Sequence, residues 1–183
     1  MNARGFMLIA GILFAAGGAL PIAALAQSGP SAAPGIDVKP IGKVLSVSGM
    51  AHIEHPAAVV VEAKLSTGDT PTKIGDLVYQ GDIIQTGSDG ALSITFADGT
   101  SFNVSKNAKM EVNNFIYDPN GHSNSSLLSL TKGTFTFIAG NVAHSGDMKV
   151  NTPVGTMGIR GTAPRVEILD DGTVKFSTLV EQK

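Results

Sequence analysis

The chain has 183 residues, 15% of them charged, a formal net charge of −2 at pH 7, and no cysteine. The weakly acidic balance argues against a nucleic-acid-binding protein, which needs clustered lysine and arginine to neutralise phosphates. The lack of cysteine excludes disulfides, thiolate metal sites and cysteine nucleophiles.

Residues 1–26 have the features of a secretory signal peptide. An uncharged apolar run extends from Gly5 to about Leu20, and Ala24-Leu25-Ala26 forms a small-x-small cleavage pattern. Pro21 interrupts the apolar stretch and no basic cluster follows it, which favours cleavage over a retained membrane anchor. We therefore expect an exported protein, periplasmic, secreted or at the cell surface, with no stable membrane span after cleavage.

Residues 27–40 are rich in proline, glycine, serine and alanine, a composition typical of a linker. The folded domain is predicted to span residues 41–183. Its dominant pattern is apolar alternation with period two, interrupted by Gly/Asp turns, and no segment shows a sustained helical stripe. Strands are predicted around residues 45–53, 59–65, 77–78, 83–84, 91–96, 102–104, 110–117, 128–130, 135–139, 148–152, 166–168 and 174–176.

Two local patterns refine this prediction. Gly75-Asp76-Leu77-Val78 recurs six residues later as Gly81-Asp82-Ile83-Ile84, which indicates two successive short strands, each after a Gly-Asp turn. Asp98-Gly99 follows an alternating strand and suits a two-residue hairpin with positive φ at both positions. Because turns recur about every ten residues and no helix lies between strands, we predict a single antiparallel all-β domain, either a sandwich or a rolled, solenoid-like structure.

The most distinctive stretch is Asn151–Thr162, which places one proline, three glycines and Arg160 between two β-like segments. Arg160 has two interpretations. It is either a buried structural arginine paired with a carboxylate or main-chain oxygens, or an exposed receptor for an anion or carboxylate. The stretch lacks the Lys-Ser/Thr ending of a phosphate-binding loop. The candidate binding residues are Arg160, Thr152, Gly158, Gly161 and Thr162.

Five motifs resemble, in order and spacing, those of a FecR-type domain. The resemblance extends from about Ile41 to Ile168. It rests on Gly42-Lys43-Val44 with Val47-Ser48-Gly49, Gly81–Gly87, Asp98-Gly99-Thr100, Leu130-Thr131-Lys132-Gly133, and Thr152-Pro153 with Ile159–Thr162.

This resemblance implies an all-β periplasmic module. In the best-known members, the module belongs to a membrane-spanning regulator of an extracytoplasmic-function sigma factor and receives a signal from an outer-membrane transporter. Only four residues precede the apolar run, and they cannot supply the cytoplasmic anti-sigma segment of those regulators. The further C-terminal receptor-contacting region is also lacking. We therefore expect a stand-alone exported FecR-like domain.

No catalytic, metal or cofactor site is predicted. His52 and His55 are three residues apart in a predicted strand, and this spacing places them on opposite faces. His144, Ser145 and Asp147 are too close in sequence to converge as a catalytic triad does, and no Gly-x-Ser-x-Gly elbow is present. We therefore predict that the protein is not an enzyme.

Two functions stay open from the sequence. The first is a non-catalytic binding or signal-sensing module that recognises an envelope protein, a peptide or a glycan through a sheet edge or through residues 152–162. The second is a structural envelope or surface protein whose edge strands pair with copies of the same chain. The first predicts a saturable interaction, and the second predicts self-association.

Overall fold

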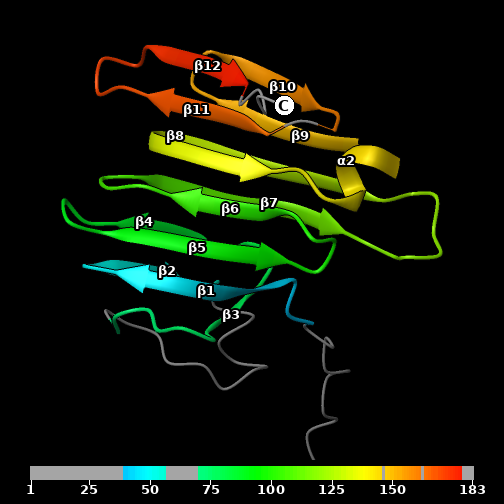
Figure 1. The fold of residues 1–183 in the computed structure, drawn as a ribbon, viewed down its shortest axis with the longest axis horizontal. Coiled ribbons are helices and arrows are strands. Elements are labelled where there is room, and N and C mark those ends of the chain that lie inside the picture. Colours follow the sequence, from blue (N-terminus) through cyan, green and yellow to red (C-terminus); the bar gives the residue numbers. More distant parts are fainter. Residues whose placement is uncertain (1–38, 57–69, 146, 162, 179–183) are drawn as a thin grey trace, which may run out of the picture. The chain divides into compact units, whose positions relative to one another are not determined.

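The computed structural model describes residues 39–56, 70–145, 147–161 and 163–178. The predicted signal peptide, residues 27–38 of the linker, the predicted strand at 59–65 and Thr162 lie outside these ranges. The described residues belong to one compact unit of the chain and form strands with one short helix, α2 (Asn141–Ser145), so the all-β prediction is confirmed (Figure 1).

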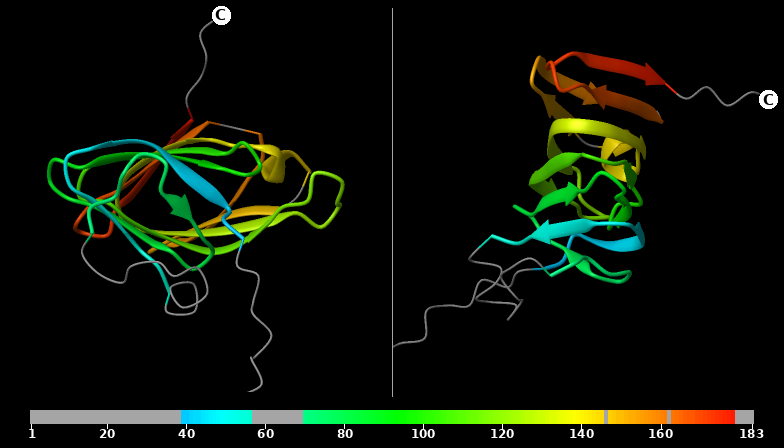
Figure 2. Two further views of the ribbon diagram at one scale, coloured as in Figure 1. Left: turned by 90° about the horizontal axis from the view of Figure 1, so that it is seen from below. Right: turned by 90° about the vertical axis from the view of Figure 1, so that its left-hand side faces the viewer.

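The strands form one hydrogen-bonded sheet that folds into two layers. In strand order, the first layer contains β3 (Leu77–Val78), β1 (Gly42–Ser48), β5 (Ala91–Phe96), β6 (Ser101–Val104), β8 (Ser125–Ile138), β11 (Pro164–Ile168) and β12 (Val174–Thr178). The second layer contains β2 (Ala51–Glu54), β4 (Ile83–Thr86), β7 (Lys109–Ile116), β8 again, β9 (Asp147–Thr152) and β10 (Gly155–Ile159). Figure 2 shows the two layers from the side and from below.

β8 belongs to both layers because it bends near Gly133. Before the bend it pairs with β7 and β9, and after it with β6 and β11. Gly133 has φ +99°, and a Cβ at this position would lie 2.4 Å from the Ala108 Cβ. Inward side chains change parity across the bend, from Leu128 and Leu130 to Phe135 and Phe137. The sequence pattern predicted two strands here, and the structure has one bent strand.

One strand pair departs from the antiparallel prediction. β9 lies parallel to the first half of β8, with Leu128 opposite Val150. A parallel neighbour needs a crossover, and α2 with the second half of β8 provides it. All other strand pairs among the described residues are antiparallel. The rolled alternative of the sequence prediction therefore describes the fold best.

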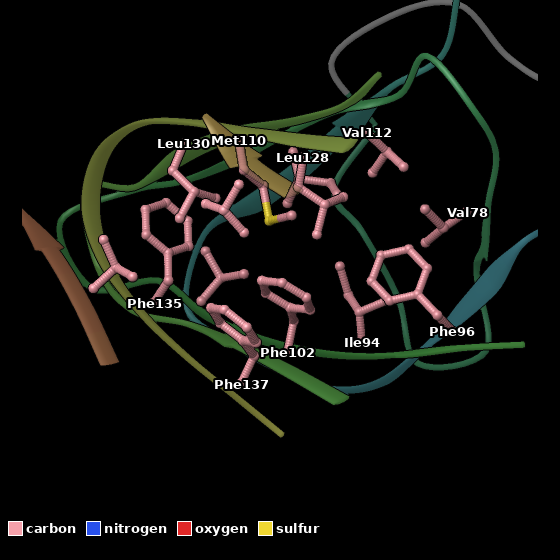
Figure 3. Close-up of a cluster of buried hydrophobic side chains, with 14 of the residues drawn as sticks. Val78, Ile94, Phe96, Phe102, Met110, Val112, Leu128, Leu130, Phe135 and Phe137 are labelled. Atoms are coloured by element: carbon pink, nitrogen blue, oxygen red, sulfur yellow. The ribbon is translucent and has the colours of Figure 1, made fainter. Parts of the chain in front are cut away.

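The hydrophobic core fills the space between the layers. Figure 3 shows aromatic side chains of the first layer pointing toward Met110 and Leu128 of the second layer. Among them, Phe102 and Phe137 are fully buried and stack with their ring centroids 4.5 Å apart. With no cysteine in the chain, stability comes from this packing and from the strand hydrogen bonds.

The strand predicted over residues 45–53 is two strands, β1 and β2, separated by Gly49 with φ +62°. A bulge between Val44 and Ser46 changes the register with β5. Val44 is therefore buried, while Leu45 is 46% exposed. Simple alternation would place Leu45 on the same face as Val47 and Ala51, and the bulge is the reason that Leu45 does not share their face.

The Gly-Asp echo is confirmed as two equivalent turns. In each turn the aspartate carboxylate accepts a hydrogen bond from the amide three residues earlier, Lys73 to Asp76 at 2.7 Å and Tyr79 to Asp82 at 2.8 Å. Gly75 and Gly81 have φ of +91° and +89°, and β3 and β4 follow directly. The sequence repeat thus encodes the same hydrogen-bonded turn twice, each time before a short strand.

The β5–β6 hairpin is also confirmed, with a different turn. The Gly99 amide donates to the Phe96 carbonyl and the Phe96 amide to the Thr100 carbonyl, so the connection is longer than two residues. Only Gly99 has positive φ, whereas Asp98 does not. The Asp98 side chain is instead buried.

Candidate functional site

Most of the stretch predicted as a binding loop is a strand. β9 ends at Thr152, Pro153 and Val154 form the turn, and β10 returns antiparallel to β9. Pro153 lies just beyond the end of β9, which suits a residue that cannot donate a ladder hydrogen bond. Among the described residues β10 pairs with β9 alone, so its other edge is open.

Arg160 is exposed, and nothing in the described part of the chain forms a hydrogen bond or ion pair with it. The interpretation as a buried structural arginine is therefore wrong. The preceding Ile159 is buried against the core, and adjacent residues of an extended chain point to opposite sides. Among the described residues, the guanidinium of Arg160 therefore has no partner and points away from the core.

The four predicted site residues that the structure describes do not converge. Thr152 lies at the turn end of β10, where its Oγ1 donates to the Gly155 carbonyl at 2.9 Å. Gly158 is an exposed residue of β10 opposite Lys149. Arg160 and Gly161 follow the far end of β10, about 16 Å from the turn at the usual rise of a strand. Thr162 lies outside the described residues.

Gly161 has a specific conformational role. Its φ is +60°, and a Cβ would lie 3.0 Å from Cε1 of His144 at the end of α2. A side chain at this position would therefore meet both backbone strain and the imidazole. Gly161 shapes the chain after Arg160, which supports a role in positioning this arginine.

β12 is the second open edge at the same end of the layers. Among the described residues it pairs only with β11, just as β10 pairs only with β9, and Figure 1 shows the two as the last strands of the stack. Phe176 of β12 lies opposite Val166, so both side chains lie on the core-facing side of the sheet. Val166 is buried, whereas Phe176 is 47% exposed. The core is therefore incompletely covered at this end.

A buried carboxylate lies at the opposite end of the layers. The Asp82 side chain is 0% exposed, and its Oδ1 is 2.9 Å from Nδ1 of His55, while its Oδ2 accepts from the Tyr79 amide. Burial raises the pKa of Asp82, opposed by the hydrogen bonds from Tyr79 and His55 and by the charge of His55. The His55 and Tyr79 rings meet edge to face. This contact network ties the end of β2 to the turn before β4.

The sequence did not identify this network. Asp82 was interpreted as a turn residue, which it also is, and nothing in the spacing indicates that His55 lies against it. The pair has no neighbouring nucleophile, and no described group of three or more His, Asp or Glu side chains is placed to hold a metal ion. We regard the pair as structural.

A surface groove of about 440 Å³ lies between the β6–β7 connection, the bend of β8 and β11. Its charged lining residues are Lys106, Arg165, Glu167 and Asp170. The two signs are mixed, so the groove does not favour a ligand of one charge. In the described ranges, no helix is long and apolar enough to cross a membrane.

Comparison with protein families gives one match. A family model described as FecR protein matches residues 82–180, more than half of the chain, from the start of β4 through β12. No curated protein and no solved structure matches the chain. The matched region includes the Asp98 turn, the bent strand β8 and both open edges.

Proposed function

The chain belongs to the FecR protein family, and from this membership we propose that it is a non-catalytic binding and signal-sensing module that works outside the cytoplasm. The observation that carries the proposal is the open end formed by β10 and β12, with the exposed Arg160 beside it. The predicted signal peptide supports a place in the periplasm or at the cell surface.

The open edges favour an extended polypeptide as the ligand. An edge strand presents a row of unpaired N–H and C=O groups, and a partner segment satisfies them by adding a strand. β10 is suited to this role because Gly155, Thr156 and Gly158 are small, uncharged and exposed. An envelope protein with an extended segment, or a peptide, therefore fits the edge better than a glycan does.

Arg160 gives this surface its charge selectivity. A guanidinium can donate two parallel hydrogen bonds to one carboxylate, and these charge-assisted bonds are stronger than neutral ones. Because no described residue forms a hydrogen bond or ion pair with Arg160, we expect its guanidinium to bind a carboxylate of the partner. The proposal thus combines main-chain pairing along β10 with one anion contact at its end.

Affinity capture from an envelope extract tests the proposal, with the exported chain as bait and Arg160→Ala as the variant. Arg165→Ala is the matched control, because Arg165 is also exposed but lies in the groove beside β8. We expect wild type and control to bind the same protein, and Arg160→Ala to bind it at least about tenfold more weakly, as the loss of a charged hydrogen bond implies. Equal binding by all three proteins would remove Arg160 from the site.

The alternative function, a self-associating envelope or surface protein, is favoured by one observation. Phe176 faces the core side of its sheet and is nevertheless 47% exposed. A side chain in this position is covered when another strand is added beyond β12.

A further inference from the structure

The rows of side chains across each layer end in an uncovered apolar residue. In the first layer the row on the core side runs through Val104, Phe135 and Val166 to Phe176. The first three are buried, and Phe176 is 47% exposed. In the second layer the row Val112, Leu128, Val150 ends at Met157, which is only partly buried. Both rows thus stop at the open end.

The hydrogen-bonding groups of β12 also face this end. The Leu169 amide donates to the Thr173 carbonyl, so Leu169 and Thr173 form a hydrogen-bonded pair of the hairpin. Because such pairs alternate along an antiparallel ladder, the peptide groups of Val174, Phe176 and Thr178 point away from β11. An added strand that covers Phe176 can therefore also form hydrogen bonds with these outward-facing peptide groups of β12.

We propose that the occupant of this end is a second copy of the chain, joined by antiparallel pairing of β12 with β12 and of β10 with β10. The two layers lie face to face, so a twofold axis perpendicular to one is perpendicular to the other (Figure 2). One rotation brings both pairs of edges together when the axis passes through the centres of both strands, at Phe176 in β12 and at Met157 in β10, and this is the geometry that the proposed dimer requires. A single peptide strand covers one edge, whereas a copy of the chain presents two strands at the matching separation.

The charges permit this arrangement. With the axis at Phe176, Lys175 lies opposite Ser177 of the second copy, and the two Phe176 side chains meet. β10 carries no charged residue, and with the axis at Met157, Thr156 lies opposite Gly158 of the second copy. No like charges face each other in either strand pair.

The opposite end of the layers is protected against the same pairing. β3 has two residues only, and β2 ends with the charged Glu54. Short and charged edge strands are common means of preventing sheet extension. β10 and β12, with five residues each, lack this shortness, and β10 also lacks charge. The asymmetry selects a closed dimer through one end rather than an open chain of copies.

This inference rests on the proposed function, since it names a partner for the same open end. The dimer covers β10 and its neighbourhood, so a partner segment and a second copy compete for one surface. Binding of the partner would then convert the homodimer into a complex of one chain with the partner, and this change would be the signal.

Disulfide trapping tests the dimer directly, because the chain has no cysteine of its own. Residues opposite each other in a hydrogen-bonded antiparallel pair have Cα atoms about 5.5 Å apart, within the range of a disulfide. Phe176→Cys should therefore form a covalent dimer on mild oxidation. The control is Ile116→Cys in β7, because Ile116 has a similar exposure of 51% but lies away from the open end. No cross-linking, or equal cross-linking by both variants, would overturn the inference.

Sedimentation equilibrium of the exported chain provides the second test. We expect the mass of two chains for wild type and for Ile116→Lys, and the mass of one chain for Phe176→Lys. A wild-type monomer at every concentration overturns the dimer. If that monomer still binds an envelope protein in an Arg160-dependent manner, the proposed function stands without the dimer; if it binds none, both fail.

Discussion

Oδ2 of Asp98 accepts a hydrogen bond from the Val142 amide at 3.1 Å, across 44 residues of sequence. Val142 lies in the first turn of α2, and the neighbouring Asn141 and Gly140 amides bind the Asp98 carbonyl and Thr100 Oγ1. The β5–β6 turn thus caps a helix that it does not adjoin in sequence, which positions the crossover between the layers.

The Asp98 cap gives the first prediction. Asp98→Ala leaves the Thr100 and Val142 amides without this acceptor, and each buried unpaired donor costs about 1–3 kcal/mol. We expect the free energy of unfolding to fall by about 2–4 kcal/mol in denaturant titrations. Asp171→Ala is the control, since Asp171 accepts from the Thr173 amide in a similar but exposed turn. A loss no greater than that of Asp171→Ala would contradict the capping role.

The bend of β8 gives the second prediction. Gly133→Ala combines a positive φ with a Cβ 2.4 Å from the Ala108 Cβ, so backbone strain and overpacking together should cost about 2–5 kcal/mol. Gly172→Ala should cost about 1–2 kcal/mol, because Gly172 has φ +82° and open space around it. Thermal unfolding of both variants measures the difference. Equal losses would show that the contact with Ala108 relaxes freely.

The buried Asp82 gives a prediction for pH dependence. Its pKa is raised above the ordinary 3.8, so between 3.8 and the raised value the folded protein binds more protons than the unfolded chain. The free energy of unfolding should therefore fall as the pH rises through this window, and the loss should persist above it. Asp82→Asn cannot ionise and keeps an oxygen for the Tyr79 amide, so its profile should lack this fall.

The comparison with Asp82→Asn is needed because Asp171 acts in the opposite direction. Hydrogen bonds from Thr173 lower the pKa of Asp171, so its contribution to stability is lost as the pH falls. The wild type and Asp82→Asn both keep Asp171, so the difference between their curves of unfolding free energy against pH reports on Asp82 alone. A profile of Asp82→Asn parallel to that of wild type would contradict the assignment.

Arg160 gives the fourth prediction. Because its side chain is exposed and has no partner among the described residues, Arg160→Ala should change the free energy of unfolding by no more than about 0.5 kcal/mol. Melting curves of the two proteins test this. A loss of several kcal/mol would restore a structural role for the arginine and make its binding experiment uninterpretable.

The sequence predicted those parts of the fold that depend on local chemistry. The alternation in Ala91–Phe96 and the two Gly-Asp turns depend on neighbouring residues alone, and all are present. The exposure of Leu45 does not follow from the sequence, because a bulge shifts the register without any mark in the apolar pattern. The sequence predicts two strands, 128–130 and 135–139, where the structure has one bent strand, because a glycine with positive φ occurs both in turns and in strand bends.

The site was less predictable because its parts are joined by contacts distant in sequence. The exposure of Arg160 depends on Ile159 taking the core-facing position, and the pairing of His55 with Asp82 depends on how β2 and β4 meet. No spacing rule encodes either contact. The strand around residues 174–176 is predicted and present as β12, but the apolar pattern contains no information on what lies beyond it.

The passage of β8 through both layers also bears on how the domain unfolds. A sandwich of two separate sheets can lose one sheet while the other persists, but here a single backbone segment supplies a central strand to each. Fraying of either layer removes pairing partners from the same segment, so we expect the two layers to exchange their amide hydrogens in one cooperative event. A domain of this kind suits the transmission of a binding event, because a disturbance at its open end reaches both layers through one continuous strand.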